Sequence, residues 1–312
     1  MSRLLMLAAA AGGFAIATHQ AARGAERARP APGRFIAADG VRLHVLDRGP
    51  PDADGPPVVL LHGNGSMVED FDSSGLIDLL ARHRRVVAID RPGFGRSDRP
   101  RDRDWTPEAQ AAVIAGAIGR LGLARPIVLG HSFGAMVAMA MVLDHASKLG
   151  GLVLESGYYF PSLRADAVLF APPAIPILGD VIRYTYGPPL GRAMAKPLIR
   201  RMFAPLPVPR RFKREFPLPL TLRPWQIRAV AEDSAAMVPA AARLSARIGE
   251  LRLPIAILAG EEDRIVSPER QARRLHGMIP GSRLVLLPGA GHMLHHASPA
   301  VVEDAVRGLS PA

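Results

Sequence analysis

Residues 128–138 read VLGHSFGAMVA, and they place one serine, Ser132, between two glycines where an apolar run gives way to helix formers. The run PIVLGHS (126–132) is typical of a strand, and the small and apolar residues of 133–146 favour a helix. A strand that turns this tightly into a helix leaves no room for a Cβ atom on either side of the serine, so glycine is required. The stretch therefore predicts a nucleophile elbow, a turn that exposes the hydroxyl group of Ser132.

Short apolar runs like this one recur along the chain and alternate with helical patterns. Most are nearly continuous in apolar character, as strands covered on both faces are. The predicted strands are 34–38, 41–46, 57–63, 84–90, 126–132, 149–156, 253–260 and 282–289, and the predicted helices are 68–82, 106–121, 133–146, 268–279 and 299–309. Asp39-Gly40 predicts a hairpin turn between the first two strands. The alternation predicts an α/β fold with a doubly wound, mostly parallel eight-stranded sheet.

One long stretch interrupts the alternation. Residues 157–250 show no strand pattern and are rich in proline, arginine, aromatic residues and short helical pieces. This predicts a helical insertion over the carboxyl ends of the strands, where α/β sheets bind their ligands. The expected organisation is an N-terminal segment (1–33), a core built from 34–156 and 251–312, and a helical cap or lid (157–250).

Composition narrows the function classes. The 312 residues include no cysteine, which excludes disulfides, thiolate zinc sites and cysteine nucleophiles. The net charge of +11 is compatible with nucleic acid, an anionic membrane or acidic substrates, and equally with an arginine-rich composition that has no functional meaning. Nucleic acid is not expected, because the chain shows no binding motif for it and no aromatic stacking platform.

The N-terminal segment differs from the rest of the chain. Leu4–Thr18 is apolar but shorter than the ~20 residues that a perpendicular membrane helix needs. Ala15-Ile16-Ala17 resembles the cleavage site of a secretory signal. The arginines that follow favour an uncleaved anchor with the folded part in the cytoplasm. They are Arg23, Arg27, Arg29 and Arg34. We expect membrane attachment, at the inner membrane of a bacterium, with export after signal cleavage as the alternative.

Polar residues stand at the ends of the predicted strands. In chain order they are His62, Asn64, Asp90, Ser132, Glu155, Asp263 and His292. Serine, acid and histidine in this order are what serine hydrolases on such sheets use. A serine hydroxyl needs a base to become a nucleophile, histidine titrates near neutral pH, and a carboxylate behind the histidine fixes its tautomer.

From about residue 34 to residue 309 the chain resembles an α/β-hydrolase with a helical cap. The matching pieces are LLHGNG (60–65), DRPGFGRSDRP (90–100), GHSFG (130–134), GEEDRIVSP (260–268) and GAGHMLHH (289–296). The resemblance implies a serine hydrolase that acts on carboxylic esters or related apolar acyl substrates through an acyl-enzyme intermediate. It implies a triad of Ser132, Asp263 and His292, and an oxyanion hole made by the backbone N–H groups of Asn64 and Phe133. It implies no metal and no cofactor.

Some members of the family draw their acid from the position of Glu155. We prefer Asp263, because its loop resembles the usual acid loop of the family. His295 and His296 are expected to begin the following helix or to flank the pocket. His62 and His131 are expected to orient loops, and Asp90 to tie two loops together.

Other functions of the same fold stay open. Dehalogenases and epoxide hydrolases of the family carry aspartate where this chain has Ser132, which favours attack on an acyl carbon here. The alternatives are a C–C bond hydrolase, a cofactor-free haloperoxidase or perhydrolase, and a binding protein of this fold without catalysis.

The predicted cap carries most of the net charge. Residues 160–249 contain fourteen Lys/Arg against five Asp/Glu. The segment 194–220 interleaves these charges with apolar residues, which predicts a lid whose apolar side lines an acyl pocket and whose basic side faces anionic lipid. The alternative is a solvated cap surface.

Overall fold

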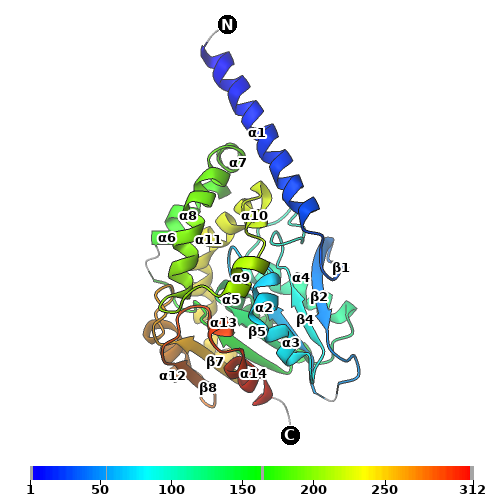
Figure 1. The fold of residues 1–312 in the computed structure, drawn as a ribbon. Coiled ribbons are helices and arrows are strands. Elements are labelled where there is room, and N and C mark those ends of the chain that lie inside the picture. Colours follow the sequence, from blue (N-terminus) through cyan, green and yellow to red (C-terminus); the bar gives the residue numbers. More distant parts are fainter. Residues whose placement is uncertain (1–2, 54, 163–164, 310–312) are drawn as a thin grey trace.

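An eight-stranded sheet forms the centre of the molecule in the computed structural model (Figure 1), which describes residues 3–53, 55–162 and 165–309, with the backbone alone described for the helical residues 3–11 and 165–167. The strand order is β1-β2-β4-β3-β5-β6-β7-β8. All neighbouring pairs are parallel except β1–β2 and β2–β4. The strands are β1 (Arg34–Ala38), β2 (Val41–Arg48), β3 (Val58–Leu61), β4 (Val86–Ile89), β5 (Ile127–His131), β6 (Gly151–Glu155), β7 (Ile255–Gly260) and β8 (Arg283–Leu287). The predicted fold class is confirmed.

The predicted hairpin between the first two strands is also confirmed. Ala38 of β1 pairs with Val41 of β2, so only two residues form the turn. Asp39 and Gly40 both have positive φ angles, 47° and 76°, as a tight hairpin turn of the primed type requires.

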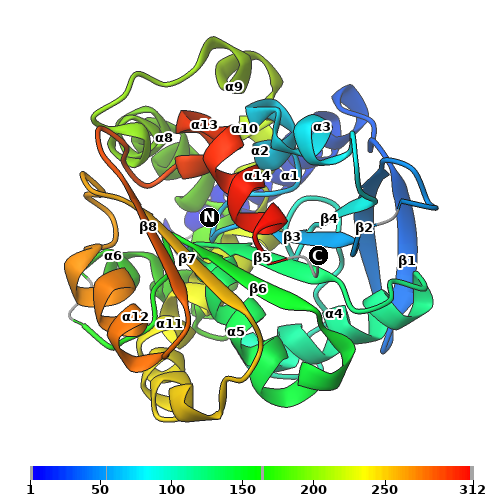
Figure 2. The same ribbon diagram turned by 90° about the horizontal axis from the view of Figure 1, so that it is seen from below.

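Helices cover both faces of the sheet, because alternate side chains of each strand point to opposite sides (Figure 2). Val59 and Leu61 of β3 join the apolar cluster that includes helices α4 and α5. Val58 and Leu60 join the cluster on the other face, with α3 and α14. The helices of the core are α2 (Glu69–Ser74), α3 (Leu76–Leu80), α4 (Pro107–Arg120), α5 (Phe133–His145), α12 (Arg274–Met278), α13 (Leu294–Ala297) and α14 (Pro299–Arg307).

Two predicted helices differ from the observed ones. The helix expected over 68–82 is divided into α2 and α3, because Gly75 has a φ of 84° and ends the first helix in a left-handed conformation. The helix expected over 268–279 begins with a π-helical turn, η4 (Glu269–Arg273), and only its second half, α12, is α-helical.

The region between β6 and β7 contains helices and loops but no strand as far as it is described. The helices are α6 (Ala165–Phe170), α7 (Leu178–Tyr184), α8 (Gly187–Phe203), α9 (Arg210–Glu215), α10 (Leu218–Thr221) and α11 (Pro224–Ser245), with short 3-10 turns between some of them. Together they lie on one side of the sheet, and we call them the cap (Figure 1). The longest, α11, also packs against α5, the helix that follows Ser132.

The N-terminal helix α1 (Arg3–Ala28) leaves the body beside the cap and points away from it (Figure 1). Its last turns are fixed to the cap: Arg223 donates a hydrogen bond to Glu26 at 2.7 Å, and the guanidinium of Arg23 lies 5.3 Å from the ring centroid of Trp225. Among the residues that the structure describes, no helix has the length and apolar character needed to cross a membrane.

Candidate active site

Ser132 occupies a strained turn between β5 and α5. Its φ of 54° and ψ of −119° are unfavourable for a residue with a side chain, and such strain is concentrated at functional sites. The two glycines of the motif make the turn feasible. A Cβ atom on Gly130 would overlap the carbonyl oxygen of Gly134, and one on Gly134 would overlap that of Leu61. The elbow predicted from the sequence is therefore present.

The structure brings His292 and Asp263 together. The imidazole Nδ1 of His292 lies 2.8 Å from Asp263 Oδ2, and both side chains are buried. The other oxygen, Oδ1, accepts hydrogen bonds from the backbone N–H groups of Ile265 (2.7 Å) and Val266 (2.9 Å). Burial alone would raise the pKa of Asp263, but His292 and these hydrogen bonds outweigh it and hold the pKa below its usual value. Asp263 is thus a fixed, ionised partner for His292.

The backbone of His292 is tied to the elbow through His131. His131 Nε2 lies 3.1 Å from the carbonyl oxygen of His292. A carbonyl oxygen can only accept, so this nitrogen carries the hydrogen and donates the hydrogen bond. Burial lowers the pKa of His131 to about 3, which keeps the ring neutral. His131 precedes Ser132 directly, and the hydrogen bond therefore holds the histidine loop beside the nucleophile turn.

The two predicted oxyanion donors lie at the same edge of the sheet as Ser132. Gly63 approaches the elbow so closely that a Cβ atom on it would lie 3.1 Å from the Cβ of Ser132, which places the loop of Asn64 beside the serine. Phe133 is the first residue of α5, so its N–H has no partner within the helix and lies at the positive end of the helix dipole. Within the described part of the chain, neither amide donates a backbone hydrogen bond.

Arg91 holds the loop that carries Asn64, a role that the sequence analysis missed. Its guanidinium is completely buried and donates to the carbonyl oxygens of His62 (Nε, 2.8 Å) and Gly63 (3.1 Å). A third bond, of 2.8 Å, reaches the carboxylate of Asp233 on the cap helix α11. The arginine of DRPGFG was the available signal, but its partner in α11 is 142 residues away.

Asp90 joins three segments, in agreement with the structural role predicted for it. One carboxylate oxygen accepts from the backbone N–H of Val68 at 2.8 Å. The other accepts from the N–H of Arg96 at 2.9 Å and lies 2.7 Å from His44 Nδ1. The carboxylate of Asp90 thus connects the loops after β3 and β4 to strand β2, and both of its oxygens are used in these bonds.

Glu155 also has a histidine partner, but the histidine is His295. Glu155 Oε1 lies 2.6 Å from His295 Nδ1 and accepts the backbone N–H of His295 at 2.9 Å. On the other side of the ring, His295 Nε2 lies 3.3 Å from Asp70 Oδ1, and His296 Nε2 lies 2.9 Å from the same oxygen. Burial would lower the pKa of His295, but Glu155 and Asp70 raise it to about 10. His295 therefore carries a positive charge at neutral pH.

Within the described residues, the groups whose side chains have metal-ligand chemistry also contain His295. Two groups share His295: Asp70 with His295 and His296, and His131 with Glu155 and His295, each with ligand atoms within 4.8 Å of one another. A metal ion would have to displace the proton of His295, which two carboxylates hold. The arrangement favours a buried ion pair over a metal centre.

Apolar side chains of the cap lie beside the histidine loop. Phe203 and Phe212 pack with Met293, the neighbour of His292 in sequence. The rings of Phe203 and Phe212 lie 5.1 and 5.3 Å from that of His296. Apolar residues of the predicted lid segment (194–220) thus pack against the loop that carries His292.

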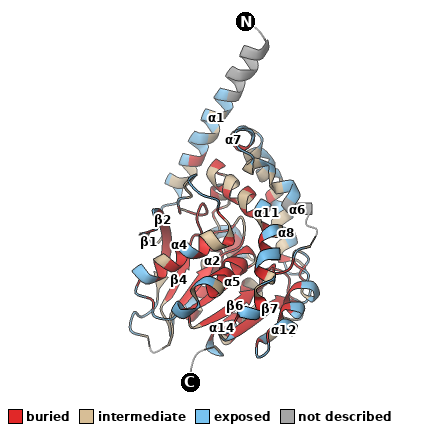
Figure 3. Ribbon diagram, turned by 180° about the vertical axis from the view of Figure 1, so that it is seen from behind, coloured by how far each residue is buried: buried red, intermediate tan, exposed pale blue. Residues whose placement is uncertain are grey.

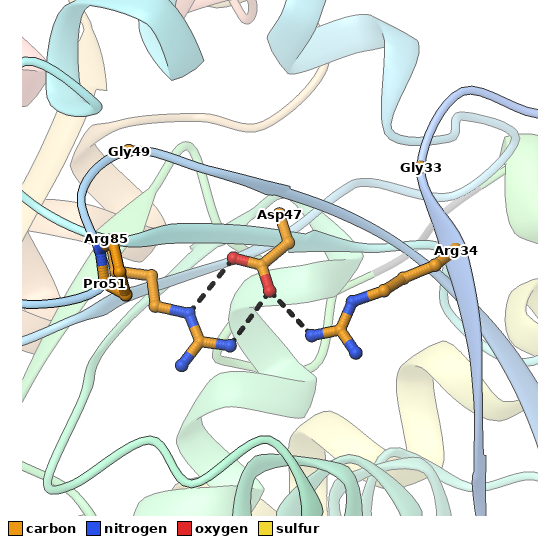
Figure 4. Close-up of a pocket in the computed structure, with 6 residues that line it drawn as sticks. All are labelled: Gly33, Arg34, Asp47, Gly49, Pro51 and Arg85. Carbon is orange, nitrogen blue, oxygen red and sulfur yellow. Dashed lines mark hydrogen bonds and ion pairs between the residues drawn. The ribbon is translucent and has the colours of Figure 1, made fainter.

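A surface pocket of about 530 Å³ lies elsewhere, near the start of β1 and the end of β2 (Figure 4). Asp47 in this pocket bonds to Arg34 at 2.8 Å and to Arg85 at 2.9 Å, so its charge is already paired. Arg85 immediately precedes β4, which places the pocket at the amino ends of the parallel strands. Ser132 stands at the opposite edge, where α/β sheets bind their substrates.

Comparison with known proteins agrees with this geometry. Residues 56–299 match the family model described as alpha/beta hydrolase fold. The chain is 30% identical over 268 residues to a 2-hydroxy-6-oxo-2,4-heptadienoate hydrolase of Pseudomonas putida (83% of this chain, 89% of the relative). It is 26% identical to haloalkane dehalogenase 2 of Mycobacterium tuberculosis (89% and 94%).

Among solved structures, a thermophilic esterase from Thermogutta terrifontis is 25% identical and superposes with a TM-score of 0.69, covering 88% of this chain and 97% of the esterase. These relatives are hydrolases with different substrates, and the family match spans most of the chain. The protein is therefore a hydrolytic enzyme, and it belongs to the alpha/beta hydrolase fold family.

Proposed function

We propose that the protein hydrolyses carboxylic esters of apolar acyl groups, with Ser132 as nucleophile, His292 as base and Asp263 as the acid. The observation that carries this proposal is the buried 2.8 Å pair of His292 Nδ1 and Asp263 Oδ2, on a loop that His131 ties to the turn of Ser132. The pair fixes the imidazole tautomer so that Nε2 is the nitrogen that accepts a proton.

These proposed roles define the reaction. Ser132 Oγ attacks the carbonyl carbon of the ester and gives its proton to His292 Nε2, while the N–H groups of Asn64 and Phe133 bind the oxyanion. The C–O bond to the alcohol breaks, and the alcohol leaves with the proton from His292. Water then gives a proton to His292 and attacks the acyl-enzyme, which releases the carboxylic acid and restores Ser132.

Hydrolysis of a carbon–carbon bond is the second candidate function. It is suggested by the Pseudomonas putida relative, whose name gives 2-hydroxy-6-oxo-2,4-heptadienoate as its substrate. An oxo-dienoate carries a carboxylate that needs a cationic partner. The buried cation nearest the oxyanion loop, Arg91, is already bonded to two carbonyl groups and to Asp233. Phe203, Phe212 and Met293 on the cap side favour an uncharged acyl chain. We therefore rank the ester first.

The experiment compares p-nitrophenyl esters of increasing acyl length with a 2-hydroxy-6-oxo-dienoate. We expect turnover of the esters and at least tenfold lower kcat/KM for the dienoate. Ser132→Ala should remove the activity. Ser156→Ala is the matched control, because Ser156 also follows a strand with a positive φ (46°). Faster turnover of the dienoate would make the C–C hydrolase the correct function, and full activity in Ser132→Ala would exclude the serine mechanism.

A further inference from the structure

Exposed apolar side chains are concentrated in α1 and in the first part of the cap. Ten of the thirteen large apolar side chains that are exposed in the described residues belong to α1 or to residues 168–190 of the cap. They are Phe14, Ile16, Val168, Leu169, Ile175, Ile177, Leu178, Val181, Tyr186 and Leu190. A soluble surface usually scatters such residues, so a concentration of this kind marks an interaction site.

Helix α7 and the loop before it form the tip of the cap. This tip lies beside α1, and the two contact one another (Figure 1). The most exposed of these apolar residues, Ile177, is 82% accessible, and its φ of 64° is rare for a β-branched residue. The chain thus holds an unfavourable conformation while presenting an isoleucine to the outside. Exposed residues lie on the described part of α1 and on α7 (Figure 3).

The lid segment predicted from the sequence is not this surface. In 194–220 the large apolar residues Ile199, Met202, Phe203, Phe212 and Phe216 pack inward around Met293. Helix α8 (Gly187–Phe203), whose second half belongs to this segment, also carries charge. Arg192, Lys196 and Arg200 are exposed, and within the described part of the chain none of them forms an ion pair. Arg192 lies in the first turns of α8, the helix that contacts α7, whereas Lys196 and Arg200 lie further along α8.

We propose that α1, α7 and the first turns of α8 form a docking surface for an anionic lipid bilayer. Residues 4–18 of α1 contain no charged residue. A helix without a polar stripe matches lipid on every side, whereas a protein groove covers only one face. Ile177 and its neighbours enter the interface between headgroups and acyl chains, and Arg192 in the first turns of α8 meets the phosphates. The docking surface goes beyond the proposed hydrolysis and does not depend on it.

The absence of cysteine permits a specific test. The full chain is prepared with Ser132→Ala, so that lipid turnover does not interfere, and with Ile177→Cys labelled by an environment-sensitive dye. Met278→Cys is the matched control, because Met278 is an exposed apolar residue (47% accessible) outside the docking surface. Each protein is added to vesicles of phosphatidylcholine with or without phosphatidylglycerol, including vesicles whose acyl chains carry a nitroxide quencher.

We expect a blue shift and at least twofold quenching of the dye at position 177 with phosphatidylglycerol vesicles, and no change at position 278. Salt should weaken the effect, because the Debye length is about 10 Å at 0.1 M. An unchanged dye at position 177, or equal quenching at both positions, would overturn the proposal. A blue shift at position 177 that follows protein concentration without vesicles would also overturn it, since a second copy would then cover the surface. None of these readouts depends on catalysis.

Discussion

Two of the buried histidine–carboxylate pairs, His292 with Asp263 and His295 with Glu155, differ in what their histidines can do. In both, a histidine Nδ1 contacts a carboxylate, at 2.8 Å for His292 with Asp263 and at 2.6 Å for His295 with Glu155. The second nitrogen distinguishes them. His295 Nε2 faces Asp70, whereas His292 Nε2 has no partner within the described residues. His292 can therefore accept a proton on Nε2, whereas His295 with its carboxylates is a fixed ion pair.

The comparison shows that position along the sheet does not by itself identify the catalytic acid. Glu155 ends β6 and Asp263 follows β7, and both positions supply acids in this family. A carboxylate on each side of His295 makes it a cation, which cannot act as a general base. A base requires one nitrogen held by an acid and the other nitrogen open to the nucleophile.

The largest difference is expected between the two histidines. His292→Ala should lower kcat for ester hydrolysis by about 10⁴-fold or more, because Ser132 loses its base. His295→Gln should leave kcat within about tenfold, since its charge supports the fold and not the chemistry. Steady-state kinetics on both variants, with circular dichroism as a check of folding, makes the comparison. Equal losses in the two variants would remove the distinction between the pairs.

The carboxylates should follow the same ranking. Asp263→Asn is expected to lower kcat by roughly 10³- to 10⁴-fold with little loss of stability, because the amide permits the wrong tautomer of His292. Glu155→Gln is expected to lower the free energy of unfolding by about 3 kcal/mol, the lower end of the cost of breaking a buried ion pair. Chemical denaturation and kinetics on both variants measure the two effects. The reverse ranking in kcat would move the catalytic acid to Glu155.

A smaller effect is expected from the loop that carries Asn64. Arg91→Lys keeps the charge beside Asp233 but loses the fork that binds the carbonyl groups of His62 and Gly63. A shifted oxyanion donor should lower kcat by about 10- to 100-fold with KM little changed. Arg99→Lys is the control, because Arg99 also contacts Asp233 but not the loop. Equal losses in kcat would assign the effect to the cap contact instead.

The last prediction concerns the dependence of stability on pH. The folded pKa of His295, about 10, lies above the unfolded value near 6.5, so the folded state retains a proton that the unfolded state loses between these values. The stability contributed by His295 is complete below about pH 6.5 and is lost as the pH rises through about 10. The free energy of unfolding therefore falls by at most about 1.4 kcal/mol per pH unit in this range. Urea denaturation at pH 7 and pH 9.5 should show a larger loss for the native chain than for His295→Gln, and equal losses would contradict the raised pKa.

Some features could be predicted from the sequence because they depend on neighbouring residues. The elbow at Ser132 follows from its two glycines, and the sheet follows from continuous apolar runs. The break at Gly75 was missed, since a glycine within a helical pattern is often tolerated. The contacts Glu155–His295 and Arg91–Asp233 join residues 140 and 142 positions apart, so they depend on how the cap and α13 fold back. No local pattern indicates such contacts.

The central claim is that Ser132 is the nucleophile and that His292 with Asp263 activates it. The most direct measurement is the rate of covalent labelling by a fluorophosphonate, followed by intact mass and peptide mapping, in the native chain, Asp263→Asn and Glu155→Gln. We predict a single adduct on Ser132, formed at least a hundredfold more slowly in Asp263→Asn and at a nearly unchanged rate in folded Glu155→Gln. An adduct on another residue, or slow labelling in Glu155→Gln alone, would contradict the claim.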